Sequence, residues 1–282
     1  MDYPQMIYKS NALVEAAYRL SVQEQRIVLA CISQVRHDQQ VTDEVLYSVR
    51  AADLAQLSGI AIEAAYSELK AAALRLKRRE VRLTQEPNGK GKKPKTMITG
   101  WVQTIFYIDG EGRVELRFTK DMLPYLTELT RQFTKYALTD VAKMDSTYAI
   151  RLYELLMQWD SLSSREIELE QLRKWLQLEE RYPSIKDFKK WVLEPAVAQI
   201  NEHSPLSVSW SQRKTGRKVT HLQFQFGPKE TNKPALPNTE SKPAKRQKRK
   251  AISKAEAEKL ARPGESYDEL YQRLSSEYLI RD

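Results

Sequence analysis

Four charged side chains lie close together near the start of one predicted helix, residues 184–201. They are Lys186, Asp187, Lys189 and Lys190. Lysine ammonium groups can bind phosphates and the acceptor atoms of guanine, and a carboxylate can accept a hydrogen bond from cytosine N4. Apolar residues at helical spacing predict a buried stripe on the other side, made of Ile185, Phe188, Val192, Ala196 and Ile200. Taken alone, such charges are also typical of an ordinary solvated helix face.

A basic turn follows this helix and favours a nucleic-acid ligand. Residues 206–226 contain two runs of alternating apolar and polar residues, which predict a β-hairpin. Four cations flank Thr215-Gly216 at its turn: Arg213, Lys214, Arg217 and Lys218. A recognition helix followed by a basic β-ribbon is the order of a winged-helix domain, whose helix enters the major groove with its N-terminal half. Pro195 lacks a backbone donor and should bend the helix beyond that half.

An earlier stretch follows the same order and is more basic. Nine basic and two acidic residues lie between Arg75 and Lys95. They end a predicted helix, residues 62–78, or crowd the loop EPNGKGKKPK. Those expected to contact DNA are Arg75, Arg78, Arg79, Lys90, Lys92, Lys93 and Lys95. Because this helix offers mainly Ala and Leu, we predict contacts to phosphates here rather than base recognition.

No combination of residues predicts catalysis, and we expect no enzyme activity, metal or cofactor. Asn88-Gly89-Lys90-Gly91-Lys92 is glycine-rich, but the chain has no G-x-x-x-x-G-K-[ST] motif, which excludes a P-loop. No His-x-His pair occurs, which disfavours a nicking replication enzyme. Cys31 is the single cysteine and predicts a small buried side chain, with no internal disulfide. We expect all five tryptophans in the core: Trp101, Trp159, Trp175, Trp191 and Trp210.

Two units of similar element order should position these side chains. In the first, Ser21 and Glu24 form a capping-box pattern that separates a short helix, 10–19, from a longer one, 22–36. Leu13, Leu20 and Ile27 recur every seven residues across this break, which favours core packing over a coiled-coil seam. The other predicted elements are a strand at 46–49, helices at 51–57 and 62–78, strands at 80–84, 98–108 and 113–118, and a short helix at 121–129.

The second unit repeats this order with little residue identity. Its predicted elements are a helix at 146–159, a strand at 167–169, a helix around 172–176, the helix 184–201 and the hairpin 206–226. We therefore predict an α+β fold of two tandem winged-helix domains with pseudo-repeat topology, residues 1–135 and 136–228. Residues 229–282 are rich in Pro, Lys, Asn and Ser, which predicts a basic and mostly disordered tail. Within it, residues 266–280 have the spacing of a short helix, typical of a partner-docking segment or a frayed end.

The overall composition agrees with a nucleic-acid-binding protein. The chain has 282 residues, a net charge of +9 and 41% hydrophobic residues, which suffices for two modest cores. No run approaches the ~20 apolar residues that cross a bilayer. The N-terminus lacks the pattern of a secretory signal. We therefore expect a cytoplasmic protein with no membrane partner.

Three segments of the chain resemble the initiator replication proteins of theta-replicating, iteron-containing plasmids. YKSNALVEAAYRLSVQEQRIVL is similar to the opening signature of that family, and FTKYALTDVAKMDSTYAIRLYELL to the junction of its two winged helices. FKKWVLEPAVAQIN followed by GRKVTHLQFQF is similar to its second recognition helix and ribbon. The three motifs occur in the expected order and the resemblance covers most of residues 7–227.

This resemblance implies a function for each unit. It implies that the C-terminal winged helix recognises the major groove of an iteron through Lys186, Asp187, Lys189 and Lys190, and that the N-terminal unit contacts the adjacent backbone and forms a homodimer. In that family, monomers bind tandem iterons and melt the origin, while dimers bind an operator inverted repeat and repress their own gene. The host initiator and the replicative helicase are the usual partners. A stand-alone transcriptional repressor of the same fold, with no role in origin opening, is the alternative.

Overall fold

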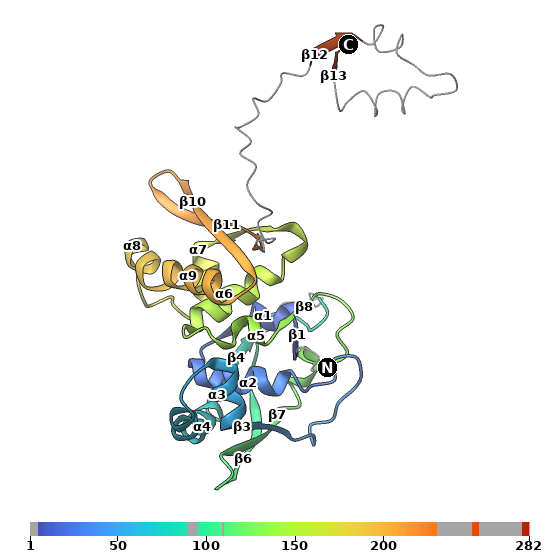
Figure 1. Ribbon diagram of the computed structural model, residues 1–282, viewed down its shortest axis with the longest axis vertical. Helices are drawn as coiled ribbons and strands as arrows, with labels where there is room; N and C mark the ends of the chain where they lie inside the picture. The colour runs from blue at the N-terminus through green and yellow to red at the C-terminus, as the bar shows by residue number, and fades with distance from the viewer. Residues whose placement is uncertain (1–4, 90–94, 109, 230–249, 254–277, 282) are drawn as a thin grey trace, which may run out of the picture. The chain divides into compact units, whose positions relative to one another are not determined.

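The computed structural model describes residues 5–89, 95–108, 110–229, 250–253 and 278–281 (Figure 1). Residues Met1–Glu230 form one compact unit and Thr231–Asp282 another. In the latter, β12 (Lys250–Ser253) pairs in parallel with β13 (Tyr278–Arg281). The helix predicted over 266–280 is therefore wrong at its C-terminal end, where backbone pairing with β12 fixes an extended conformation. Residues 266–277 and most of the predicted tail lie outside the described residues.

Three helices form the centre of the first winged helix. They are α2 (Val22–Ile32), α3 (Ala51–Ser58) and α4 (Ile62–Leu76). The capping box predicted for α2 is confirmed: the Glu24 N–H donates to the Ser21 hydroxyl at 3.3 Å, and the Ser21 N–H donates to the Glu24 carboxylate at 2.8 Å. α3 ends at Gly59, whose φ of +72° is rare for residues with a side chain. The helix predicted at 51–57 is thus confirmed, with a sharp end that lets α4 start three residues later.

Three small antiparallel sheets surround these helices, in the orders β2-β4-β5, β3-β7-β6 and β1-β8. Their strands are β1 (Met6–Ser10), β2 (Ala17–Tyr18), β3 (Tyr47–Arg50), β4 (Glu80–Leu83), β5 (Met97–Gly100), β6 (Val102–Ile108), β7 (Arg113–Phe118) and β8 (Phe133–Ala137). The single strand predicted at 98–108 is therefore two strands in different sheets. The side chain of Trp101 at the break is fully buried, so the chain turns from one sheet to the other around a core residue.

The N-terminal helix predicted at 10–19 is much shorter in the structure. α1 (Asn11–Val14) is followed directly by β2, because long-range hydrogen bonds replace the helical ones. The Arg151 guanidinium donates to the Ala16 carbonyl at 2.8 Å, and Tyr18 pairs with Val81 of β4. The helix predicted at 121–129 is likewise only a short 3₁₀ turn, η1 (Leu123–Tyr125).

The second winged helix follows the predicted element order closely. Its elements are α5 (Thr139–Ala142), α6 (Thr147–Met157), the 3₁₀ turn η2 (Asp160–Leu162), β9 (Ser164–Glu168), α7 (Leu169–Trp175), α8 (Ile185–Phe188), the π-helical segment η3 (Lys189–Leu193), α9 (Glu194–His203), β10 (Leu206–Thr215) and β11 (Lys218–Pro228). The antiparallel ribbon β10–β11 carries β9 on its other edge, in the order β10-β11-β9. α6 packs against both α9 and the N-terminal elements. The domain boundary between residues 135 and 136 stays a prediction.

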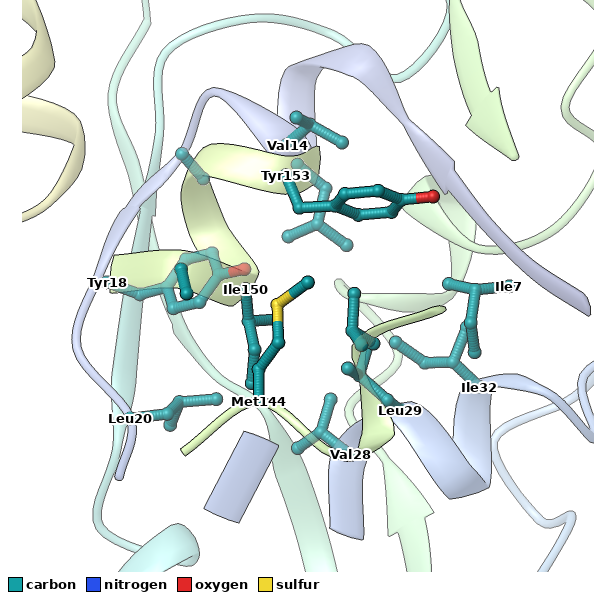
Figure 2. Close-up of a cluster of buried hydrophobic side chains, with 14 of the residues drawn as sticks. Ile7, Val14, Tyr18, Leu20, Val28, Leu29, Ile32, Met144, Ile150 and Tyr153 are labelled. Carbon is teal, nitrogen blue, oxygen red and sulfur yellow. The ribbon is translucent and has the colours of Figure 1, made fainter. Parts of the chain in front are cut away.

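A shared apolar cluster joins α6 to the first winged helix. Figure 2 shows Ile150 and Tyr153 of α6 beside Val14, Val28 and Leu29 from the N-terminal elements. The three positions of the seven-residue repeat are also buried within the chain's own core: Leu13, Leu20 and Ile27. The repeat therefore marks core packing, as predicted, and not an exposed seam.

A buried ionic cluster lies at the same junction. The Glu154 carboxylate of α6 accepts from the Lys9 ammonium of β1 at 2.5 Å and from the Tyr136 hydroxyl of β8 at 2.6 Å. It also faces the Tyr18 hydroxyl and the Arg151 guanidinium, each at 3.3 Å. Burial alone would raise the pKa of Glu154, but Lys9 and Arg151 outweigh it and hold that pKa below its ordinary value. The cluster ties β1, β2, β8 and α6 together through charge.

Candidate nucleic-acid interface

The recognition helix, residues 184–203, packs on its core as the sequence predicts. The Ser184 hydroxyl caps it by accepting from the Lys186 N–H at 3.2 Å. Of the predicted stripe, Ile185 is half-buried and the other four are buried: Phe188, Val192, Ala196 and Ile200. The predicted irregularity near Pro195 precedes the proline, as the π-helical segment η3, instead of following it. Pro195 cannot donate to the carbonyl four residues earlier and its ring crowds that carbonyl, which lies inside η3.

The charges at the start of this helix differ in their surroundings. Lys186, Asp187 and Lys190 are exposed, and they lie on the side opposite the buried stripe. Lys189 is half-buried, with its Nζ 5.5 Å from the ring centroid of Trp210 on β10. Lysine at this position therefore contacts the ribbon, whereas the other three are open to a ligand.

Two tryptophans contradict the prediction that all five belong to the core. Trp191 of η3 is 55% exposed and Trp159, just before η2, is 40% exposed. Trp101 is fully buried, and Trp175 and Trp210 are half-buried against the core. Helical spacing explains Trp191: it lies four residues after exposed Asp187 and three after Phe188, on the outward side of the helix. Residue type had suggested burial, and the period of the helix decides against it.

A buried arginine that no sequence pattern singled out supports the start of the recognition helix. The Arg173 guanidinium of α7 donates to the Arg181 carbonyl at 3.0 Å and to the Pro183 carbonyl at 3.5 Å. It also lies 4.7 Å from the ring centroid of Phe188. Arg173 thus holds the loop before the helix and its first buried aromatic ring in one arrangement.

The ribbon presents its cations at the tip, and one of them is paired. Gly216 at the turn has a φ of +62°. Lys214, Arg217 and Lys218 are exposed around it. Arg213 instead donates twice to the Glu166 carboxylate of β9, at 3.0 and 2.7 Å, and Gln223 of β11 donates to the same group at 2.8 Å. These hydrogen bonds hold the pKa of Glu166 at about 2, and they raise the pKa of Arg213.

The predicted phosphate-binding cations of the first winged helix also divide into paired and exposed groups. The Arg79 guanidinium donates to the fully buried Glu24 carboxylate at 2.9 and 3.0 Å, and Arg75 donates to it at 3.2 Å. Arg78 and Lys95 are exposed. The loop residues Lys90, Lys92 and Lys93 lie outside the described residues. Contact of any of these side chains with DNA stays a prediction.

The two sets of cations face a common side of the compact unit. In Figure 1, α8 and the tip of the β10–β11 ribbon lie toward the left edge, and α4 lies toward the same edge below them. A helix followed by a basic ribbon, twice in one chain, is a geometry for holding a long polyanion at two places. Among the residues that the structure describes, no three His, Cys, Asp or Glu side chains gather to hold a metal ion.

Comparison with known families decides the identity of this arrangement. The model of the first winged helix of initiator replication proteins matches residues 6–157, and that of their second winged helix matches residues 168–226. The chain belongs to the initiator replication protein family. The two tandem winged helices predicted from sequence are thereby confirmed. The family is not known as an enzyme family.

Relatives and a solved structure agree with this family. A replication initiation protein of Escherichia coli is 28% identical over 229 residues, 78% of this chain and 69% of that protein. The PI protein of Escherichia coli is 25% identical over 245 residues, 77% of this chain and 80% of that protein. The crystal structure of the Pi initiator protein in complex with iteron DNA has the same fold, with a TM-score of 0.68 and 23% identity over 82% of this chain and all of that one. In the described part of this initiator, no helix is long and apolar enough to cross a bilayer.

Proposed function

We propose that this initiator binds tandem iterons at a plasmid origin and starts replication there. Its family and the similar fold of an initiator bound to iteron DNA support this function. The observation that carries it is the second winged helix, where a capped helix presents Lys186, Asp187 and Lys190 outward beside a ribbon tipped with cations. Lysines on such a helix can bind guanine edges and phosphates, and the ribbon cations can follow the backbone.

Within this proposal, the two winged helices have different tasks. The second recognises bases, because its helix offers a carboxylate and lysines on an exposed side. The first contacts the phosphate backbone, since the exposed side of α4 is short of groups suited to base edges and its cations gather at the C-terminal end and in the following loop. In this scheme Asp187 accepts from cytosine N4, and Lys189 supports the ribbon through Trp210 while its ammonium remains within reach of a phosphate.

A footprint on the plasmid's own origin tests the proposal. Protection of direct repeats spaced by about two helical turns (~20–21 bp) is the expected result, because each winged helix then meets the same side of the duplex. Protection of a lone inverted repeat at the promoter, with no repeats at the origin, would instead support the stand-alone repressor.

We further propose that a homodimer, in equilibrium with the monomer, binds an inverted repeat and represses the initiator's own gene. The edge strand β6 supports dimer formation: its sequence VQTIFYI carries no charge, and Phe106 is 45% exposed. In the described part of the chain, β6 pairs only with β7 and leaves its other edge open. An open apolar edge is suited to antiparallel pairing with the same strand of a second copy around a two-fold axis. The host initiator and replicative helicase are the proposed cytoplasmic partners of the DNA-bound monomer.

A further inference from the structure

An exposed tryptophan occupies the centre of the outward side of the recognition helix. Going along that side, the exposed residues are Asp187, Lys190, Trp191 and Glu194, which recur at helical spacing. Trp191 is 55% exposed, while the next two residues along the chain, Val192 and Leu193, are almost fully buried. Its indole therefore adds little to the core and forms the largest apolar surface on a side that otherwise carries charge.

The neighbours of Trp191 keep its ring available to a ligand. The Nζ of Lys190 lies 4.6 Å from the centroid of this indole ring. A lysine over one face of the ring sets the direction of the indole and leaves its edge and other face open. The residue also lies within the π-helical segment η3, and such segments occur frequently at functional sites.

We propose that Trp191 recognises thymine through its C5-methyl group when the helix lies in the major groove. This inference rests on the proposed function and deepens it by naming a base. Thymine is the one base that presents an apolar methyl group in that groove. Lys186, Asp187 and Lys190 can pair with phosphates, guanine and cytosine, but they offer no apolar surface for thymine. Trp191 supplies that surface at the next turn of the same side, so one helix face distinguishes more than G·C pairs.

Thymine-to-deoxyuracil exchange measures this contact one methyl group at a time. The probe is the repeat that the initiator protects at its own origin, with each thymine replaced in turn by deoxyuracil. At the contacted position, the wild-type chain should lose about fourfold in affinity, the equivalent of ~0.8 kcal/mol for one buried carbon. Trp191→Ala should bind the thymine and deoxyuracil repeats equally, because the methyl group has lost its partner. Trp191→Phe should retain a reduced preference for thymine.

Trp159→Ala is the matched control, since Trp159 is also exposed but lies outside the recognition helix. It should keep the full fourfold preference for thymine. The inference is overturned if no deoxyuracil position weakens the wild-type chain, or if Trp191→Ala retains the same preference. Binding of the unmodified repeat no better than random DNA would overturn the proposed function as well, whereas specific binding without methyl dependence would overturn only the role of Trp191.

Discussion

Replacing Glu154 by glutamine should destabilise this initiator by about 3–5 kcal/mol, the usual cost of removing one partner from a buried ion pair. The carboxylate is fully buried and faces four donors, with Lys9 at 2.5 Å and Tyr136 at 2.6 Å the nearest. Glutamine has almost the same volume, so it leaves no cavity. It does leave the charges of Lys9 and Arg151 buried without a counter-charge. Because a domain is stable by only ~5–15 kcal/mol, the loss is a large share of the total.

Urea unfolding of the full chain, followed by far-UV circular dichroism, measures this loss. Glu170→Gln is the matched control, because Glu170 also lies three residues from an arginine, with 3.8 Å between it and Arg173, but its side chain is 77% exposed. The control should change the free energy of unfolding by less than ~1 kcal/mol. If Glu154→Gln unfolds within about 1 kcal/mol of the wild type, the charge cluster does not hold α6 on the first winged helix.

The pH dependence of the same difference provides an independent check. The pKa of Glu154 is lower in the folded chain than in the unfolded one, because Lys9 and Arg151 favour its charged form. The stability that the carboxylate contributes is therefore complete above the unfolded pKa of ~4.3 and is lost as the pH falls through the folded pKa. The wild type and Glu154→Gln should differ by a constant amount from about pH 5.5 to 8 and converge in acid. A difference that grows in acid would reverse the assigned sign.

Three other variants test the interface. Lys186→Ala with Lys190→Ala should weaken binding to the cognate repeat more than to random DNA in a gel-shift competition, and equal losses would remove their role in base recognition. Neutralising the loop lysines should lower affinity on all sequences and flatten its salt dependence by at most ~0.9 for each phosphate that the loop no longer neutralises; an unchanged slope would place the loop away from DNA. The loop lysines are Lys90, Lys92, Lys93 and Lys95. Phe106→Lys on β6 should shift the chain toward monomer in sedimentation, whereas Ile98→Lys, on the exposed side of β5, should not; unchanged dimers in both would exclude β6 as the interface.

Local sequence signals predicted most of the elements that carry the interface. The capping box placed the start of α2, and the helical spacing of Phe188, Val192 and Ile200 identified the buried side of the recognition helix. Both signals act within a few residues, so they do not depend on the rest of the fold. The short strands β2 and β8 had no such signal, because they exist through pairing with β4 and β1 far along the chain.

The state of individual cations could not be predicted from sequence. Arg79 pairs with a carboxylate 55 positions away, and Arg213 with one 47 positions away. Nothing in the spacing of these residues indicates such partners. The sequence correctly placed cations near the ribbon and after α4, but it treated all of them as equally available.

This division of the cations changes the expected energetics of DNA binding. A lysine or arginine in water meets a phosphate as a full charge and displaces counterions from the DNA, which makes affinity depend on salt. Arg213 in its pair with Glu166 has most of its charge already neutralised, so it can contribute to a phosphate contact only by exchanging one anion for another. The exposed cations, Lys186, Lys190 and those at the ribbon tip, should therefore set the salt dependence. Because that exchange adds little to the net charge that meets the DNA, the measured slope should correspond to fewer phosphates than the number of basic residues near the duplex.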